Sequence, residues 1–359
     1  MTERHSTGGD DSAPLDITIL DVGHGNAAVV RDGTRCAVVD ATPGDVVLTE
    51  LERVGIERIE HLVISHADND HAGGSLGLLL DDTRTLGVIW FNADGQKNSR
   101  TWERFRRAVW TRHRRGGCDG IRSIHTETGE TLICGRARLE VCHPSILMAA
   151  SGPTGHAPEF GTLTSNTLSV VVRVHLAEQP TALLAADMDA VAFRHIQETG
   201  RDLRAPVLVF PHHGGLPGKS VDAREFAQSL AAMVAPELVI FSIVGGLRPA
   251  NPQPDIMSGV RHGAPEAHIA CTQLSVHCHR PGEPVPEEHL ALRPAAGRKN
   301  SRCCAGSVTV SRVGDELHID PPLSRHTDFI GARVEQPLCR VTAVIPRQQS
   351  GDAARRERP

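Results

Sequence analysis

The chain has 359 residues, which is enough for one large domain or two smaller ones. Hydrophobic residues make up 40% and charged residues 23%, a balance that excludes a wholly disordered chain. The 38 Lys and Arg residues against 43 Asp and Glu give a net charge of −5, and 3% of residues are aromatic, without any Tyr. These values exclude a protein that holds nucleic acid by bulk charge, and they argue against a dedicated base-stacking surface.

The two ends of the chain differ in composition from its middle. Residues 1–14 are polar and residues 346–359 are charged, so we expect loose tails around a single domain over 15–345. No apolar signal segment starts the chain, and no apolar run approaches the ~18 residues of a membrane span. Nine thinly spread Cys residues are not typical of a secreted disulfide framework. We therefore expect a cytoplasmic protein without a membrane contact.

In chain order, short apolar runs alternate with helical patterns. The first half contains predicted strands at 15–20, 26–31, 36–41, 61–65 and 87–92. Predicted helices follow at 44–54 and 99–115, the second with Trp102, Phe105 and Val109 on one face. The second half repeats this style, with strands at 139–144, 168–174, 181–187, 206–211, 237–243 and 266–272 and helices at 188–197 and 221–234. A long loop over 280–302 precedes two closing strands. Two such halves predict an α/β fold, specifically a four-layer αββα sandwich.

One segment, HLVISHADNDHAGG over residues 61–74, carries most of the chemistry. A buried strand ends at Ser65, and four potential metal ligands follow at once: His66, Asp68, Asp70 and His71. Alternate side chains of an extended loop point the same way, so His66 and Asp68 can share one metal while Asp70 and His71 face a second. The alternative is an ordinary solvated loop without a metal, but polar side chains rarely cluster in this way against the end of a buried strand.

Four ligands cannot complete two metal shells, so other strand ends must contribute. The candidates, each placed where a hydrophobic strand stops, are His143, Asp187, His212 and His213. Each could instead be a polar residue that ends a strand, and for His143 the two interpretations are balanced. For Asp187 and the His pair, the recurring placement favours metal ligands.

These motifs resemble a known family. The segments LDVGHGNA (20–27), VVDAT (38–42), SHADNDHAGG (65–74), SNTLSVVVR (165–173), LLAADMD (183–189) and FPHHGG (210–215) are similar to the metallo-β-lactamase superfamily. Within it they resemble the hydrolase domain attached to the ComEC DNA-uptake channel and its stand-alone relatives. The likeness covers about residues 15–275.

The resemblance implies a role for each matching position. His66 and Asp68 would hold the first of two divalent metal ions, with His143 as a possible third ligand. Asp70, His71 and one residue of the pair at 212–213 would hold the second, and Asp187 would bridge the two. We favour His213 as the ligand and His212 as the residue that faces the substrate. Asp40 would brace the histidine loop, and Asn166 matches a polar residue before a central strand, although a simple turn residue fits it equally well.

Two departures from the family pattern matter. Asp68 stands where many members have His, and a carboxylate shifts the preference from zinc toward manganese, so the metal could be Zn or Mn. The sequence also shows no channel-forming membrane portion, which argues against DNA import by this chain alone. A metal pair would generate a bridging hydroxide for attack on a phosphorus or carbonyl centre, with Asp70 holding the metal and His212 assisting the leaving group.

Two weaker signals remain. The helix at 99–115 carries seven Arg residues, which could follow a phosphate backbone or could simply form the solvated side of an amphipathic helix. Further on, His277 or His279 with Cys278, and Cys303 with Cys304, could form a small structural zinc site across the long loop, within a C-terminal extension at about 271–345. Ordinary buried thiols or a redox-sensitive pair are comparable alternatives.

The leading expectation is therefore a metal-dependent phosphodiesterase or nuclease with DNA or RNA as substrate. The first alternative is hydrolysis of another ester, such as a phosphocholine ester, lactone or thioester, because one fold supports many chemistries. The second is a non-catalytic metal-binding module within a larger complex, with a separately encoded partner from the same operon, for example an antiviral one.

Overall fold

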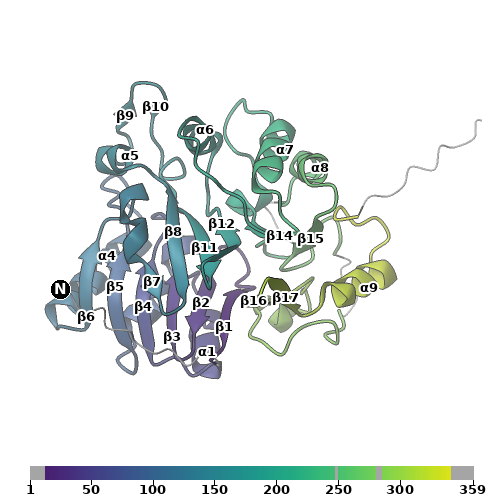
Figure 1. Ribbon diagram of the computed structural model, residues 1–359, viewed down its shortest axis with the longest axis horizontal. Coiled ribbons are helices and arrows are strands. Elements are labelled where there is room, and N and C mark those ends of the chain that lie inside the picture. Colours follow the sequence, from purple (N-terminus) through teal and green to yellow (C-terminus); the bar gives the residue numbers. More distant parts are fainter. Residues whose placement is uncertain (1–12, 247–249, 280–284, 341–359) are drawn as a thin grey trace, which may run out of the picture.

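The computed structural model describes residues 13–246, 250–279 and 285–340. Most of the first expected tail and all of the second lie outside these residues, so the expected domain boundaries stay a prediction. The described chain forms two large β-sheets with helices on their outer sides (Figure 1). No helix within the described residues is long and apolar enough to cross a bilayer.

The first sheet has eight strands. In spatial order they are β17 (Glu316–Asp320), β16 (Val308–Val313), β1 (Leu15–Ile19), β2 (Ala28–Asp32), β3 (Arg35–Val39), β4 (Arg58–Val63), β5 (Thr85–Trp90) and β6 (Cys118–Arg122). Strands β1 to β3 form an antiparallel meander, and β3 to β6 run parallel. The chain returns to this sheet near its end, because β16 pairs with β1.

The second sheet has seven strands. In spatial order they are β15 (His268–Cys271), β14 (Leu238–Phe241), β13 (Val207–Val209), β12 (Gln179–Leu184), β11 (Val171–Leu176), β8 (Ala137–His143) and β7 (Ile133–Cys134). Strands β7, β8, β11 and β12 are antiparallel neighbours, whereas β12 to β15 run parallel.

Helices cover the outer side of each sheet. The apolar cluster outside the first sheet includes residues of α1 (Val46–Arg53), α3 (Ser75–Leu80) and α4 (Arg100–Arg114). The cluster outside the second includes residues of α6 (Ala190–Glu198), α7 (Ala223–Val234), α8 (Pro254–Gly263) and α9 (Leu323–Arg333). The remaining short elements are α2 (Asn69–Ala72), α5 (Ile146–Ser151), β9 (His156–Ala157), β10 (Gly161–Thr162) and 3₁₀ turns at Thr126–Thr131, Pro211–Gly214 and Ala296–Asn300.

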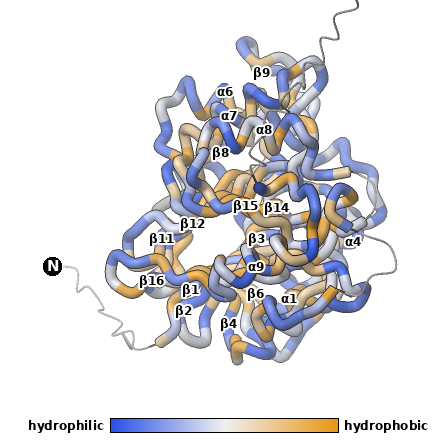
Figure 2. Tube along the Cα trace, turned by 90° about the vertical axis from the view of Figure 1, so that its right-hand side faces the viewer, coloured by the Kyte–Doolittle hydropathy of each residue, from blue (hydrophilic) through white to orange (hydrophobic). Residues whose placement is uncertain are grey.

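A third apolar cluster fills the space between the sheets. It combines residues of the first sheet, such as Ile17 and Val30, with residues of the second, such as Val172 and Val207, all without exposed surface. Figure 2 shows the apolar segments concentrated in these central strands. Helix, sheet, sheet and helix thus follow one another, and the predicted four-layer αββα sandwich is confirmed.

This topology gathers polar residues at one edge. Strands β1, β3 and β4 point the same way in the first sheet, and β12 and β13 are parallel in the second. The segments that follow β1, β3, β4, β12 and β13 carry the candidate ligands. Ligands in open α/β sheets bind beyond the carboxyl ends of strands, so this edge is where a site is expected.

Candidate metal centre

The histidine loop leaves β4 and turns at once into α2. Its sharp turn depends on close packing against the segment after β3, since a Cβ on Gly74 would lie 2.0 Å from the Thr42 carbonyl oxygen. The Gly74 N–H donates to the Ala41 carbonyl at 2.7 Å. Gly74 itself has an ordinary helical φ of −78°. Its function here is to allow two backbones to touch.

The carboxylate of Asp40 holds this loop in place through hydrogen bonds. It accepts hydrogen bonds from the Ser65 N–H at 2.7 Å and the Ser65 hydroxyl at 2.8 Å. It also accepts the Nδ1–H of His71 at 2.7 Å. All three residues are buried. Asp40 therefore sets the orientation of the His71 ring, as a carboxylate behind a metal-binding imidazole does.

A first group of ligand atoms comprises His66, His71 and Asp187, all buried. The Nε2 atom of His71 lies 3.1 Å from Asp187 Oδ1, and that of His66 lies 3.7 Å from Asp187 Oδ2. Asp187 follows β12, and its N–H donates to the Ser169 hydroxyl at 3.0 Å. Residues of both sheets therefore build this group.

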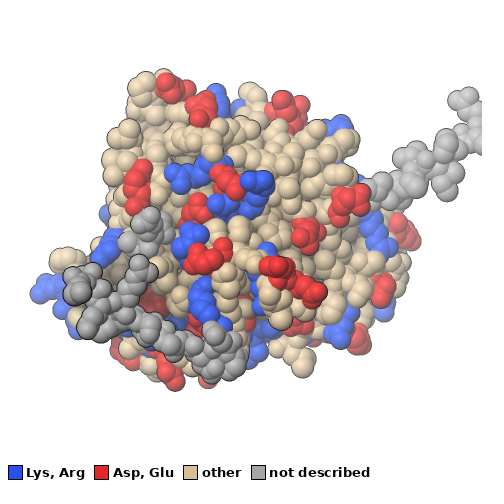
Figure 3. Space-filling model, viewed as in Figure 1, with Lys and Arg blue, Asp and Glu red and all other residues tan. Residues whose placement is uncertain are grey.

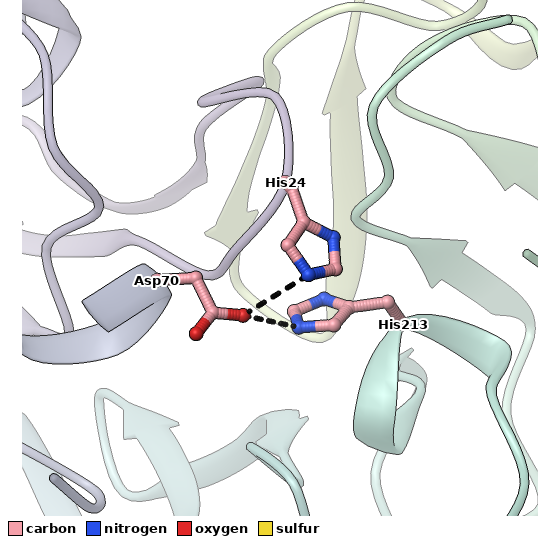
Figure 4. A group of neighbouring side chains, drawn as sticks. All are labelled: His24, Asp70 and His213. Atoms are coloured by element: carbon pink, nitrogen blue, oxygen red, sulfur yellow. Dashed lines mark ion pairs between the residues drawn. The ribbon is translucent and has the colours of Figure 1, made fainter. Parts of the chain in front are cut away.

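A second group comprises His24, Asp70 and His213 (Figure 4). The Nε2 atoms of His24 and His213 each lie 3.3 Å from Asp70 Oδ2. His24 comes from the β1–β2 turn, which rests on the ligand loop because a Cβ on Gly25 would lie 2.2 Å from the Asp70 carbonyl oxygen. His213 Nε2 is also 3.6 Å from Asp187 Oδ1, so Asp187 adjoins both groups.

The three buried imidazoles all direct Nε2 toward the common centre. His71 donates from Nδ1 to Asp40, His213 donates from Nδ1 to the Ser242 carbonyl at 2.9 Å, and the Nδ1 of His66 lies 3.0 Å from the Ser65 hydroxyl. Their Nε2 atoms, like Asp187 Oδ1, are buried and have no hydrogen-bond partner. Unpaired buried polar atoms are costly, so a shared set of them fits divalent cations.

Electrostatics favour positive charge at this centre. Burial opposes ionisation of Asp187, yet the His71 and His213 imidazoles hold its pKa well below the usual value. Burial also lowers the pKa of His71, but Asp187 and Asp40 outweigh it and raise that pKa well above normal. For His66, burial and the neighbouring His71 lower the pKa to about 4. The carboxylates thus form an anionic cage that suits a cation.

Backbone strain concentrates at the same place. Asp40, Ala186, His212 and His213 have φ values between 45° and 59°, in the left-handed region that most residues avoid. Each such residue costs roughly 1–3 kcal/mol and persists where surrounding contacts demand it. Here the strained residues hold or adjoin the converging ligands, which is a pattern of functional sites.

The rim of the centre is more exposed than the buried ligands. His212 lies with Nε2 4.0 Å from Asp187 Oδ2, and its side chain is 36% exposed. Asp68 has one oxygen 3.9 Å from His66 Nε2, while Lys97 binds the other. Lys97 is held in place by Asp94, which accepts the Lys97 N–H at 2.9 Å and the Ser165 hydroxyl at 2.6 Å. Asp68 therefore sits at the edge of the first group.

The structure does not bring His143 into either group. Its ring is fully buried, its Nε2 donates to the Thr167 carbonyl at 2.7 Å, and it packs against His195 of α6. We therefore correct the expectation that His143 is a ligand. Asn166 lies in the turn before β11, where its carbonyl accepts the Ser169 N–H at 3.1 Å. Ser169 is the residue of this turn that reaches the site, 3.3 Å from His66 Nδ1.

The expected zinc site of His277, Cys278 and Cys303 is not assembled. His277 is exposed, and the buried Cys303 thiol donates to Asp21 at 3.5 Å. Cys278 instead packs against the apolar cluster that contains Cys304. Neighbouring residues of an extended segment point in opposite directions, so Cys303 and Cys304 face different surroundings.

Sequence reasoning missed His24, Ser169 and Lys97. His24 follows a buried strand end, which is the signal that identified the other ligands, but it stands alone between two glycines. Ser169 and Lys97 carry no such signal, because their roles depend on contacts between distant segments.

Comparisons with known proteins add a family likeness. A model described as "Metallo-beta-lactamase superfamily" matches residues 20–82. A search of curated proteins finds no match. Among solved structures, Igni18, a metallo hydrolase from Ignicoccus hospitalis, is 15% identical with a TM-score of 0.41, covering 71% of this chain and 94% of that one. A diphosphatase of the PhnP family is 16% identical (TM-score 0.36; 61% and 73% covered), and the short form of human tRNase Z is 13% identical (TM-score 0.37; 64% and 92% covered).

The matched segment contains Asp40, the ligand loop from His66 to His71, and His24. Over residues 20–82, which supply four of the six converging side chains, the chain is thus similar to the metallo-beta-lactamase superfamily.

Proposed function

We propose that this protein is a metal-dependent hydrolase of phosphodiester bonds. The observation that carries the proposal is the convergence of four imidazoles and two carboxylates into two adjoining groups, with Asp187 of the first group also close to His213 of the second. His66, His71 and Asp187 would hold one divalent cation, with Asp68 at its edge. Asp70, His213 and His24 would hold the other. Two such cations, when bound, supply an activated water and neutralise charge on a phosphate.

The chain's own residues have distinct tasks in this reaction. Asp40, Ser65 and Ser242 hold three imidazoles so that each presents Nε2 to the centre. Ser169 fixes the backbone of Asp187. His212, at the exposed rim, is placed to give a proton to the leaving oxygen, a contribution typically worth about 10²–10⁴ in rate.

The rim favours an anionic substrate. His24, Lys97 and His212 are partly exposed around a buried anionic floor, and each offers an N–H donor. A phosphodiester brings a negative charge that such donors can bind, whereas a lactone or simple ester does not. The similarity of the motifs to ComEC-like hydrolases supports a nucleic acid strand as the source of that phosphodiester.

The test is an activity screen of the purified full chain with Mn²⁺ or Zn²⁺. The substrates are bis-p-nitrophenyl phosphate, single-stranded DNA, RNA and a lactone. We expect hydrolysis of the phosphodiesters and its loss in Asp70→Asn, while Asp328→Asn, a change in an exposed carboxylate, retains it. Activity that Asp70→Asn leaves unchanged, or that is confined to the lactone, would contradict the proposal.

A further inference from the structure

One tryptophan of α4 lies at the surface. Of the three Trp residues in the chain, Trp90 and Trp102 are 1% and 0% exposed, whereas Trp110 is 60% exposed. Tryptophan is highly buried on average, so an indole left in water calls for an explanation. The buried face of α4 is already formed by residues such as Trp102, Phe105 and Val109. Packing of the helix therefore does not require an indole at position 110.

Arginines surround this exposed indole. Helical spacing places the exposed Arg106, Arg107 and Arg114 three or four residues from Trp110, and therefore beside it. The guanidinium carbon of Arg114 lies 5.9 Å from the centroid of the Trp110 ring, which is a cation–π arrangement. Glu103 is the one acidic residue of α4, and it lies 3.6 Å from Arg107. The indole thus stands within a strongly basic surface.

Several arginines of this surface have no compensating charge. Arg100, Arg104 and Arg106 are exposed and form no ion pair with any described residue. By contrast, Arg31 on β2 and Arg58 on β4 are paired with carboxylates. Exposed and unpaired arginines attract a polyanion, because binding releases the counterions that surround its phosphates. The charge of α4 therefore favours an anionic, chain-like partner.

The helix connects this surface with the metal centre. The Thr101 hydroxyl donates to the Asn69 side chain at 2.8 Å, and Asn69 stands between Asp68 and Asp70 in the ligand loop. Trp110 is nine residues further along α4, or about 14 Å at the usual helical rise. A strand that reaches the metal centre can therefore also lie along α4, whereas a small ester is too short to contact both.

We propose that the exposed side of α4 is a docking surface for single-stranded nucleic acid, on which a base stacks against Trp110 while neighbouring phosphates bind the arginines. The inference rests on the proposed function, because the strand leads to the phosphodiester at the metal centre. Every base has a π-face, so stacking accepts strands of any sequence. Bases within a duplex are already stacked on one another, so a duplex offers the indole less. A single exposed indole also agrees with the low aromatic content of the chain.

Trp110→Leu tests the stacking, because Leu is apolar but has no π-face. Binding of a labelled oligo-dT of about 12 nucleotides, within the usual site sizes, is measured by fluorescence anisotropy. The Asp70→Asn background keeps the strand intact. We expect the affinity to fall by roughly 5–150-fold, the range for one stacked base. The slope of log affinity against log salt should stay unchanged, because the substitution removes no charge.

Two further variants serve as controls for this measurement. Trp110→Phe keeps a π-face and should retain most of the affinity. Leu292→Ala alters a side chain that is 94% exposed, and it should bind like the unaltered protein. Both positions are exposed, so the fold should survive, which circular dichroism checks. A parallel titration with oligo-U tests RNA; binding of either strand supports the proposal, and the tighter one identifies the sugar of the natural strand.

Tryptophan fluorescence gives a second readout. Trp90 and Trp102 are buried, so a bound strand should quench the emission of Trp110, and Trp110→Phe should lack this quenching. Binding does not require cleavage, so a protein that binds the strand without hydrolysing it contradicts the proposed function and leaves the docking surface standing. The docking surface is overturned if the unaltered protein binds no single strand, if Trp110→Leu binds as tightly as Leu292→Ala, or if a duplex of equal length binds more tightly.

Discussion

Asp40 shows how one residue can orient the side chains of the proposed metal centre without being a ligand itself. Its two oxygens fix the Ser65 backbone and hydroxyl and the His71 ring, although the residue itself has a left-handed φ of 59°. The strain is maintained by three buried hydrogen bonds. The orientation of the ligand side chains therefore depends on a residue that hydrogen-bonds to them and is not itself a ligand.

We predict that Asp40→Asn lowers metal affinity and hydrolysis by about 10–100-fold, the usual cost of altering a group behind a ligand. Asn has the same shape and tolerates the left-handed region, so the fold should survive. Its amide is neutral and binds the His71 Nδ1–H more weakly. Mn²⁺ titration by calorimetry measures the effect against Asp328→Asn. Unchanged Mn²⁺ affinity would show that Asp40 serves folding alone.

His143 yields a prediction on pH. Burial lowers its pKa to about 3, whereas an unfolded His titrates near 6.5. The unfolded chain therefore gains a proton first, and folding stability is lost as pH falls from about 6.5 toward 3, by up to about 1.4 kcal/mol per pH unit. His143→Gln keeps a donor for the Thr167 carbonyl but does not titrate. Urea unfolding at pH 6.5 and pH 5 should show a loss smaller by about 2 kcal/mol than in the unaltered protein.

The control for that prediction is His318→Gln on β17, where the ring is exposed. Metal content of His143→Gln should equal that of the unaltered protein, because His143 lies in neither ligand group. A fall in Mn²⁺ stoichiometry would restore His143 as a ligand.

His24 and His143 show what sequence can tell about single residues. His24 follows β1 and His143 is the last residue of β8, so the rule that strand ends carry ligands favours both. His24 reaches Asp70, whereas His143 turns to Thr167 and His195. The ligand loop itself was predictable because its four candidates lie within six residues. The direction of an isolated side chain depends on tertiary contacts that a sequence does not display.

At the scale of elements, α4 has the packing expected of an amphipathic helix. Trp102, Phe105 and Val109 are buried, and Arg112 is buried as well, donating to the Gly117 carbonyl at 2.7 Å. Arg100, Arg104 and Arg107 are exposed on one side by helical spacing. Thr101 donates to the Asn69 side chain at 2.8 Å, so this helix begins beside the ligand loop. On the face shown in Figure 3, basic and acidic side chains are interspersed.

If a nucleic acid strand is the substrate, these three arginines should hold it. Changing Arg100, Arg104 and Arg107 together to Glu should weaken binding of single-stranded DNA and lower its salt dependence by about 2 in log–log slope. Hydrolysis of bis-p-nitrophenyl phosphate should be unaffected. Fluorescence anisotropy at several salt concentrations measures the first effect. Changing Arg224, Arg325 and Arg333 on α7 and α9 to Glu is the matched control, and equal losses in both variants would contradict a specific role for α4.

The inner strands of both sheets were predictable, since runs such as 168–174 and 237–243 are largely apolar and overlap the observed β11 and β14. The sequence did not indicate β6, α5, α8 or α9. Strand β6 reads CDGIR and lies at a sheet edge, where little burial is required. Helix α8 begins at Pro254 after an irregular segment, and its identity depends on packing against α7. Local patterns therefore predicted the inner strands better than the peripheral elements.

Across the whole molecule, the proposed metal centre draws its side chains from both sheets. Asp70 and His71 belong to the loop after β4, whereas Asp187 and His213 follow β12 and β13. A cation held by residues of both sheets binds the folded state only, so it must stabilise the fold as a whole. The apolar layer between the sheets and cations bound at its edge would then both oppose separation of the two sheets.

We predict that Mn²⁺ at about 100 times its dissociation constant raises the free energy of unfolding by about 2.7 kcal/mol. Manganese is chosen because it prefers oxygen ligands, and two carboxylates belong to this centre. Asp187→Asn, of equal size, should abolish the Mn²⁺-dependent rise in urea midpoint, while Asp328→Asn should keep it. The comparison is made within each variant, with and without Mn²⁺, so changes in its baseline stability cancel. A full rise in Asp187→Asn would show that the cation does not bridge the sheets.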